Sequence, residues 1–331
     1  MVSPPHALAL AVGGGAYPKG TCAEGRLVGI APDKADEIVY PPDYRPPPPD
    51  PRPAGARAAA TCVTHNGRVA GYLAGCAIFR NEAPYLAEWV EFHLLVGFEH
   101  LFLYNNRSED GFAEVLAPYV AAGTVSLTDW PEFPGQISAY DDCTRAHGSD
   151  WRWIAFIDLD EYLFSPQLRP VPEILARYEH LPGVGVLWAM FGTSGHQTRP
   201  AGLTIESYVQ RYIGLRHLRQ FKSVVHPAAV TRCYGPHSFA YRDGALWPAP
   251  VPRFVHWDEL RVNHYFTRSR EELEAKLNRR LAHTGQMRNV RRPDVITRGS
   301  TVHDDAIAAY GPDLRAALAR RVKAPVPGSQ G

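Results

Sequence analysis

The sequence has no apolar run long enough to cross a bilayer. A membrane-spanning helix takes about 20 consecutive apolar residues, whereas residues 7–12 form a short run that three glycines follow. With only His6 before it, this run also makes a poor secretory signal. The sequence therefore predicts a chain with no transmembrane segment.

An excess of one charge and paired cysteines are lacking as well. The 35 Lys and Arg against 34 Asp and Glu give a net charge of +1, which argues against a nucleic-acid partner. The five cysteines are scattered, and no Cys-x-x-Cys pair occurs among them, which excludes a zinc site of that kind. Free thiols in a reducing compartment are the simplest expectation.

Proline is abundant but unevenly spread. Residues 41–53 hold a large share of the 30 prolines, and such a composition is typical of an extended spacer. We therefore predict a flexible tail over residues 1–68, one folded domain over 69–285, and an extension over 286–331. The extension is expected to hold a short helix near 313–322 and to end loosely.

From Tyr72 onward, strand and helix patterns alternate. Apolar runs predict strands over 73–79, 100–104, 124–128, 153–157 and 184–191. Apolar residues at helical spacing predict helices over 84–97, 112–121, 136–146 and 172–181. This alternation indicates an α/β fold with a mostly parallel sheet flanked by helices.

Polar residues follow several of these strands, where ligands bind in such sheets. Asp158-Leu159-Asp160-Glu161 follows the strand at 153–157. Side chains two apart on a strand share a face, so Asp158 and Asp160 are expected to converge. Converging carboxylates repel each other unless a cation or a proton intervenes, and a hard divalent ion suits oxygen ligands. The alternative is a solvated strand end.

The C-terminal half carries a second polar motif, Asn263-His264-Tyr265, before a predicted helix at 269–281. Ser269 suits the N-cap of that helix. Glu272 and Lys276 are spaced four apart, which predicts a pair on the helix surface.

Several separated motifs together resemble glycosyltransferase family 92 over about residues 73–282. They are Ala77-Ile78-Phe79-Arg80-Asn81-Glu82, Glu88-Trp89 with His93, Gly97 with His100, Asp158 to Leu163, and Asn263 to Ser269 with Glu271, Glu272 and Lys276. Two departures stand out: Arg80 lies where lysine is frequent in the family, and the membrane anchor of animal and plant members has no counterpart here.

The resemblance implies a single catalytic domain of GT-A type with a Rossmann-like sheet. It implies metal-dependent transfer, with inversion, of a sugar such as galactose from a UDP-linked donor to a glycan or lipid-linked hydroxyl. Asp158, Asp160 and His264 would hold Mn²⁺ or Mg²⁺, although His264 could also be a core histidine. A cytoplasmic setting, free or at the inner face of a membrane, suits such a chain without an anchor.

The remaining site candidates fall into three groups. Donor contacts are expected from Arg80, Asn81, Glu82, Asn106, Asp110, Asp142, Asp158 and Lys222. The loop with Gly192, Ser194 and His196 is expected on the acceptor side, because glycine permits close approach. An inverting transferase needs a general base, for which Glu161, Asp258 and Glu259 are all candidates.

Several candidates also have a structural alternative: a helix cap for Glu82, a turn for Asn106, Asp110 and the glycine loop, and a solvated side chain for Asp142 and Lys222. Two alternative functions stay open, a metal-dependent nucleotidyltransferase and an inactive glycan-binding domain. A phosphohydrolase of the haloacid dehalogenase type is disfavoured, because its acid motif follows the first strand.

Overall fold

A computed structural model describes residues 64–65, 68–69, 71–213, 220–242, 255–287 and 300–323. The tail predicted for residues 1–68 lies outside these ranges, except for 64–65 and 68. Thr64–His65 (β1) pairs with Arg68–Val69 (β2) in a short antiparallel hairpin.

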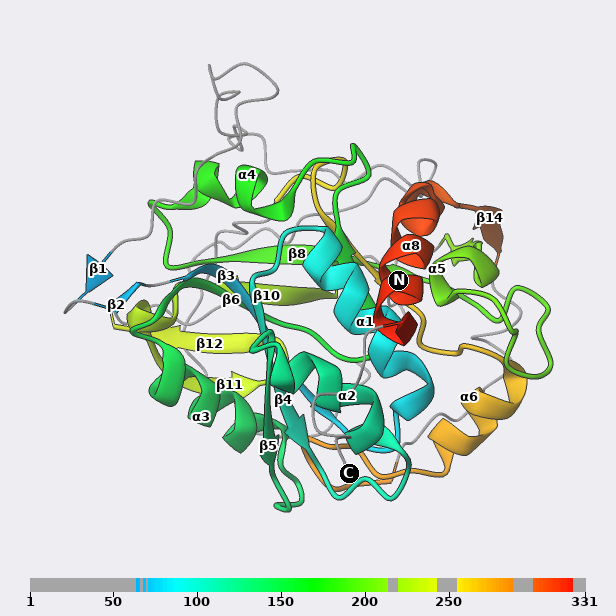
Figure 1. Cartoon of the computed structure of the whole chain (residues 1–331), viewed down its shortest axis with the longest axis horizontal. Helices are drawn as coiled ribbons and strands as arrows, with labels where there is room; N and C mark the ends of the chain where they lie inside the picture. Colours follow the sequence, from blue (N-terminus) through cyan, green and yellow to red (C-terminus); the bar gives the residue numbers. More distant parts are fainter. Residues whose placement is uncertain are drawn as a thin grey trace, which may run out of the picture.

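One eight-stranded sheet forms the centre of the described part of the chain, in the order β5-β4-β3-β6-β10-β8-β13-β7 (Figure 1). Its strands are β3 (Gly71–Phe79), β4 (His100–Asn105), β5 (Val125–Asp129), β6 (Trp151–Phe156), β7 (Glu161–Phe164), β8 (Gly183–Met190), β10 (Phe221–Val225) and β13 (Arg261–His264). Only β7 and β10 run against the other strands of this sheet. The predicted α/β fold with a mostly parallel sheet is thus confirmed.

Most helices lie where the sequence pattern predicts them. The short helix Thr204–Ser207 was not predicted, and the helix predicted for 269–281 covers only Arg270–Leu277. The helices are α1 (Ala83–Leu95), α2 (Phe112–Ala121), α3 (Gln136–His147), α4 (Val171–Leu175), α5 (Thr204–Ser207), α6 (Arg270–Leu277) and α8 (Gly311–Lys323). Short 3₁₀ turns cover Ala176–Tyr178, Pro227–Ala229 and Ala306–Tyr310. The helix predicted for 172–181 is shorter than expected: α4 ends at Leu175 and a 3₁₀ turn follows over Ala176–Tyr178. Pro182 accounts only for the end of helical backbone before Leu181.

Three pairs of short strands complete the described structure apart from the main sheet. Besides the β1–β2 hairpin, β9 (Gln210–Tyr212) pairs with β14 (Thr301–His303), and β11 (Val230–Gly235) pairs with β12 (Ser238–Tyr241).

The central strands bury both faces, and each face has its own core. On β6, Trp153 and Ala155 pack in one hydrophobic cluster, whereas Ile154 and Phe156 pack in the other. The first cluster takes in buried residues of α1, α4 and α8, and the second takes in buried residues of α3 and the β11–β12 hairpin. This alternation is what a strand covered on both sides requires.

The C-terminal helix belongs to the same core. Ile307 and Leu314 are at most 1% exposed and lie in the α1-side cluster, and Arg321 on α8 pairs with Glu91 on α1 at 2.9 Å. Residues 300–323, predicted as part of an extension, are therefore built into the folded domain. The predicted loose end after Pro325 lies outside the described residues.

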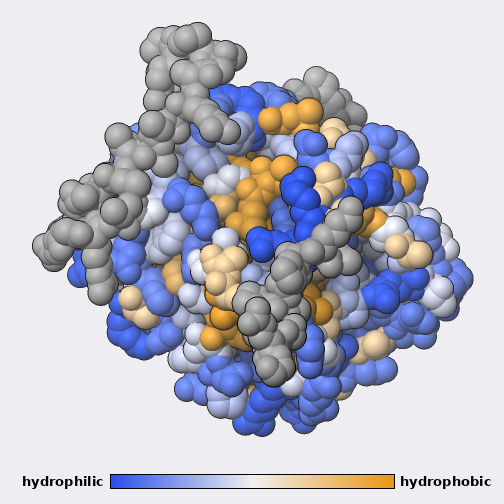
Figure 2. Space-filling model, viewed as in Figure 1, coloured by the Kyte–Doolittle hydropathy of each residue, from blue (hydrophilic) through white to orange (hydrophobic). Residues whose placement is uncertain are grey.

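The surface of this fold is largely polar. On the face that Figure 2 shows, hydrophilic residues cover most of the area and hydrophobic ones gather near its middle. Within the described ranges, no helix is both long and apolar enough to cross a membrane. Cys76, Cys143 and Cys233 are buried and unpaired, as expected for free thiols.

A buried histidine on α1 makes the stability depend on pH. His93 is fully buried, its Nδ1 lies 2.8 Å from the carbonyl oxygen of Trp89, and the N–H of Leu163 donates to its Nε2 at 3.4 Å. Only the neutral ring can donate at one nitrogen and accept at the other. Burial lowers the pKa of His93 from 6.5 to about 3.

The stabilising contribution of neutral His93 is therefore present above pH 6.5 and is lost as the pH falls toward 3. We expect this residue to account for a loss of about 2 kcal/mol in the free energy of unfolding between pH 7 and pH 5. Urea unfolding at both pH values checks this. In His93→Gln, the slope of the free energy of unfolding against pH should decrease by the amount that corresponds to about one proton. An unchanged slope would contradict the assignment.

Candidate active site

A cavity of about 1090 Å³ opens at the carboxyl edge of the sheet. The parallel strands of the sheet end at this edge, and residues at or just after the ends of four of these strands line the cavity. The lining includes Arg80, Asn81 and Glu82 after β3, Asn106 after β4, Asp158 and Asp160 after β6, and His264 at the end of β13. The expectation that polar residues gather at this edge is confirmed.

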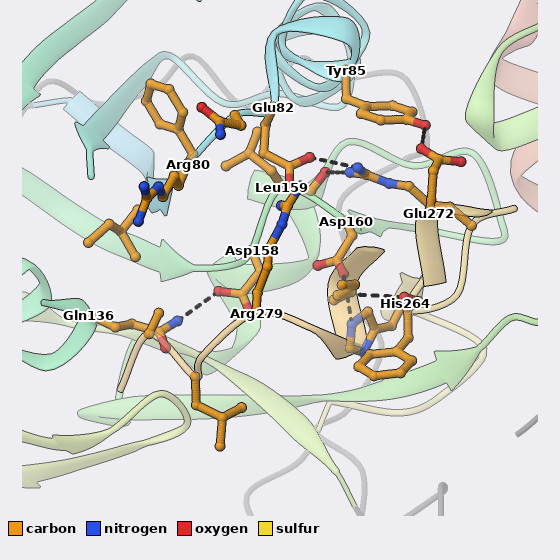
Figure 3. A pocket seen from close by; sticks show the side chains of 18 of the residues that line it. Arg80, Glu82, Tyr85, Gln136, Asp158, Leu159, Asp160, His264, Glu272 and Arg279 are labelled. Atoms are coloured by element: carbon orange, nitrogen blue, oxygen red, sulfur yellow. Dashed lines mark hydrogen bonds and ion pairs between the residues drawn. The ribbon is translucent and has the colours of Figure 1, made fainter. Parts of the chain in front are cut away.

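The acid loop does not continue the strand. β6 ends at Phe156, and residues 157–160 turn into β7. Asp158 faces α3, where its Oδ1 accepts hydrogen bonds from Gln136 at 2.9 Å (Figure 3) and from Tyr140 at 3.2 Å. Asp160 turns toward β13 and α6 instead. Strand alternation does not extend to the two acids, because the turn breaks it. Both acids nevertheless line the same cavity, and the charge of Asp160 opposes the lowering of the pKa of Asp158, so they lie near each other while facing different partners.

Lys222 explains the orientation of Asp158. Because β10 runs against β6, it begins at the cavity edge and brings Lys222 Nζ within 2.8 Å of Asp158 Oδ2 and 3.3 Å of Glu161 Oε2. Burial lowers the pKa of this lysine, but the two acids raise it above its ordinary value. Lys222 is 0% exposed and is not among the residues that line the cavity, so its observed partners are the two acids.

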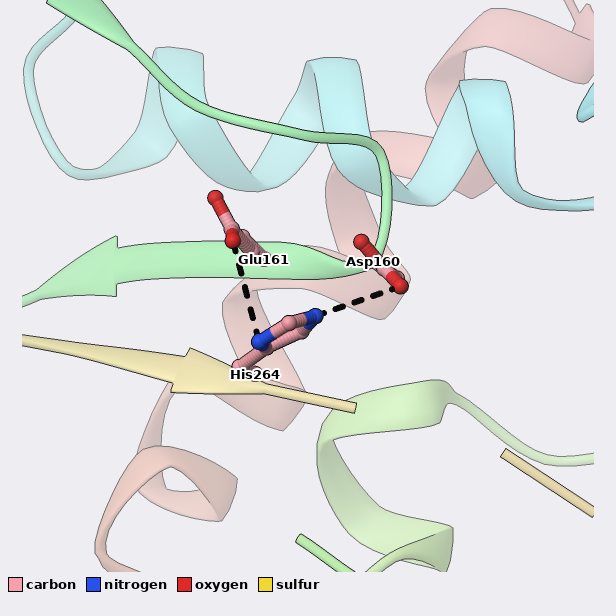
Figure 4. A group of neighbouring side chains, drawn as sticks. All are labelled: Asp160, Glu161 and His264. Atoms are coloured by element: carbon pink, nitrogen blue, oxygen red, sulfur yellow. Dashed lines mark ion pairs between the residues drawn. The ribbon is translucent and has the colours of Figure 1, made fainter. Parts of the chain in front are cut away.

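Asp160, Glu161 and His264 form a compact group of potential ligands, whose donor atoms lie within 4.8 Å of one another (Figure 4). His264 Nε2 lies 3.4 Å from Asp160 Oδ2, and His264 Nδ1 lies 3.8 Å from Glu161 Oε1. The two acids thus face opposite nitrogens of one ring. A single ion at Nε2 would share Asp160, with Glu161 behind the ring as the carboxylate that orients it.

The charge states of this group suit a divalent cation. Burial would raise the pKa of Asp160, but Lys276 and His264 hold it well below its ordinary value. Burial lowers the pKa of His264, despite the opposing effect of Asp160, so the ring is neutral at pH 7 and keeps a lone pair. Burial raises the pKa of Glu161 well above its usual range.

Two buried atoms in this group, His264 Nδ1 and Glu161 Oε1, have no hydrogen-bond partner. Metal binding at Nε2 would favour a proton on Nδ1, which could then be donated to Glu161. One carboxylate and one imidazole open to the cavity fit Mn²⁺, and Mg²⁺ less well, because Mg²⁺ prefers oxygen ligands alone.

Lys276 on α6 also reaches Asp160. Its Nζ forms an ion pair with Asp160 Oδ2, donates to the Phe266 carbonyl at 3.1 Å, and lies 4.2 Å from the centre of the Phe266 ring. The predicted surface pair with Glu272 is wrong. Glu272 forms the capping box with Ser269, as predicted, and its other contacts are with Tyr85 and Tyr208.

The signal that could have placed Lys276 at the site is helical spacing. Glu272 and Lys276 lie at i and i+4 on α6, and both line the cavity. That spacing marks one face of a helix, and here the face turns toward the acids rather than toward solvent.

Arg268 braces the acid loop from the C-terminal motif. Its guanidinium pairs with Glu82 at 2.6 Å, donates to the carbonyl of Leu159 at 3.0 Å and lies 3.4 Å from the centre of the Tyr85 ring. Its φ of +47° lies in the left-handed region, which sequence patterns do not reveal for an arginine. Glu82 stands at the N-cap of α1 without a side-chain cap bond.

The polar residues after β3 and β4 tie the loops of the cavity wall together. The backbone N–H of Asn81 donates to Ser108 at 3.0 Å, and Asn81 Oδ1 accepts from the N–H of Glu109 at 2.8 Å. The amide of Asn106 donates to the carbonyls of Trp130 and Glu132, both at 2.7 Å. These two residues therefore shape the wall, while Arg80 lies exposed on it.

Two donor candidates lie away from the cavity wall. Asp110 accepts from the N–H of Ala83 at 2.8 Å and so caps the start of α1. Asp142 accepts from the hydroxyl of Tyr104 at 3.0 Å and pairs with Arg145 at 2.6 Å. Neither residue lines the cavity, although Asp110 lies next to Glu82 and Asn81 through its bond to Ala83 and the bonds of Ser108 and Glu109 to Asn81.

The acceptor loop and the base candidates also lie off the wall. Ser194 accepts from the N–H groups of Val209 and Gln210, Gly192 donates to the carbonyl of Gln210, and His196 contacts that of Ser207. Glu161 is fully buried. Asp258 is 72% exposed beside His256, and Glu259 pairs with Arg177 at 2.5 Å.

A mostly parallel sheet with an acid loop and an imidazole at its carboxyl edge is the arrangement expected of a GT-A type domain. The sequence profile of glycosyltransferase family 92 matches residues 74–297, and the chain belongs to this family. It is 28% identical over 226 residues to the family 92 protein Os08g0121900 of Oryza sativa subsp. japonica, covering 66% of this chain. It is 31% identical over 218 residues to RCOM_0530710 of Ricinus communis, covering 62% of this chain.

The match spans 37% of the length of each of these relatives. Among solved structures, S. aureus TarS 1–349 in complex with UDP is 14% identical, with a TM-score of 0.33 over 48% of this chain and 47% of that one. The similarity to TarS is too low to assign a role to any residue of the site.

Proposed function

We propose that this chain transfers a sugar, with inversion, from a UDP-linked donor to a hydroxyl of a glycan or lipid-linked acceptor, in a reaction that depends on Mn²⁺ or Mg²⁺. The observation that carries the proposal is the Asp160–His264 pair, which opens to the cavity at the carboxyl edge of a family 92 domain. Galactose is the proposed donor sugar on the strength of the family resemblance alone.

In this proposal Asp160 and His264 hold the metal, and Glu161 orients the ring from its other nitrogen. The bound ion would act as a Lewis acid that stabilises the charge on the departing diphosphate. Asp158 serves differently, because Lys222, Gln136 and Tyr140 already engage both of its oxygens. It fixes the loop that carries Asp160.

The cavity has room for both substrates. Ligand pockets have volumes of roughly 300–1,000 Å³, and this one is about 1090 Å³. A nucleotide would lie along the ends of β3 and β4, against Arg80 and Asn106. The acceptor would then approach from the α6 side.

The general base is proposed to be Glu271 rather than any of the three sequence candidates. Glu271 lines the cavity and is exposed, and none of the described residues engages its carboxylate. A base must be able to reach the proton that it removes, which favours Glu271 over the buried Glu161 and over Asp258 and Glu259, which do not line the cavity.

A donor screen tests the proposed function. The full chain is incubated with Mn²⁺ and a panel of UDP- and GDP-sugars, and release of the nucleoside diphosphate is measured. We expect slow release from one donor even without acceptor, and its loss when EDTA is added. Release of pyrophosphate would instead favour a nucleotidyltransferase, and no release from any donor would contradict the proposal.

A further inference from the structure

Three groups compete for one carboxylate oxygen of Asp160: Lys276, His264 and the proposed metal ion. Lys276 Nζ and His264 Nε2 both face Oδ2, and the proposed metal needs a carboxylate oxygen at the same place. The side chain of Asp160 is only 12% exposed, so water screens these charges weakly. An ammonium and a divalent cation therefore cannot share this oxygen without strong repulsion.

Lys276 is placed so that it can leave. Its side chain is 23% exposed, and it lines the cavity from the surface helix α6. Its hold on Phe266 is one carbonyl contact at 3.1 Å and one ring contact at 4.2 Å. A lysine is a compact charge on a flexible four-carbon stem, so the ammonium can move into the cavity while the helix stays in place.

We propose that Lys276 is a built-in counter-cation of Asp160, which is displaced when the metal binds and then pairs with the diphosphate of the donor. This inference rests on the proposed function. The lysine neutralises Asp160 before substrate arrives, and its displacement couples metal binding to donor binding. In the loaded site, the ammonium adds a second positive charge next to the leaving group.

Lys222 provides the structural contrast. It pairs with Asp158 and Glu161 at 0% exposure, on a central strand, so it has no route to a ligand. Two lysines therefore serve the two aspartates of one loop, and only Lys276 faces the cavity.

The test measures two affinities in the full chain and in Lys276→Met. Mn²⁺ binding without nucleotide is followed by electron paramagnetic resonance, and binding of inorganic pyrophosphate at saturating Mn²⁺ by calorimetry. We expect the variant to bind Mn²⁺ about tenfold more tightly and pyrophosphate about tenfold more weakly, because each change corresponds to one charge contact of about 1.4 kcal/mol. Lys276→Gln, with a polar replacement, should also bind Mn²⁺ more tightly and pyrophosphate more weakly than wild type.

Arg270→Gln is the matched control, since it removes one positive charge from the same helix. Arg270 pairs with Glu274 at 3.2 Å, and both are about two-thirds exposed. We expect both affinities to stay within about twofold of wild type, as for other solvated pairs.

Opposite shifts in the two affinities support the proposal, including the case in which only the variants bind Mn²⁺ detectably. Shifts in the same direction, or none, overturn it and leave the metal site standing. If neither wild type nor variants bind Mn²⁺, the metal site of the proposed function fails, and this inference fails with it.

Discussion

Asp160→Asn is expected to lower the rate of sugar transfer by about 10³-fold or more, because the metal that it helps to hold supplies several kcal/mol of transition-state stabilisation. An amide keeps the size of the side chain but provides neither the charge nor the second anionic oxygen that a hard cation prefers. Asp160 is the one acid of its loop that both lines the cavity and faces His264.

Initial rates with the donor found in the screen, together with Mn²⁺ affinity, check this expectation. Glu274→Gln is the matched control, since it makes the same change on the outward face of α6, where the carboxylate is 65% exposed. The thermal midpoint of Asp160→Asn should fall, because the pair with Lys276 is lost, but a single cooperative transition above the assay temperature separates loss of chemistry from loss of fold. Activity retained in a folded Asp160→Asn protein would show that the metal is not held here.

The fold could be predicted because its elements are local. Strands and helices from Gly71 to Met190 have clear apolar patterns, and helix α2 matches its predicted bounds. The reversed strands could not be predicted in the same way. β7 begins one residue after Asp160, and β10 enters the sheet between β6 and β8; neither position follows from periodicity, since both depend on pairing between distant residues.

The location of the site followed from the sequence, but the roles of its residues did not. Asp158 and Asp160 are two positions apart and have the same side chain, yet one faces Lys222 and the other Lys276. This difference in partners depends on the turn at residues 157–160. It also depends on two lysines that are far away in the sequence: Lys222 is 64 positions from Asp158, and Lys276 is 116 positions from Asp160. The family resemblance supplied His264, whereas composition alone would have left it among 14 histidines.

Lys222→Met is expected to destabilise the fold by about 3–5 kcal/mol, the range for breaking a buried ion pair from one side. Methionine fills a similar volume, so the loss comes mainly from charge and not from packing. Asp158 is 31% exposed in its side chain and can be partly solvated, whereas Glu161 is 0% exposed and cannot. Glu161 must then either keep a buried charge without its partner or take up a proton, and both outcomes cost folding free energy. Urea unfolding at pH 7 measures the loss.

The pH dependence of that loss identifies Glu161 as its source. Burial already raises the pKa of Glu161 well above its ordinary 4.5, with Lys222 as the main opposing influence. Without the lysine this pKa rises further, so the folded variant keeps a proton that the unfolded chain has released over a wider pH range than the wild type does, and its stability keeps falling at higher pH. Lys222→Met should thus be less destabilising at pH 5 than at pH 8, and adding Glu161→Gln should recover part of the loss at pH 8. A pH-independent loss, or no recovery in the double variant, would mean that Lys222 stabilises the fold by packing.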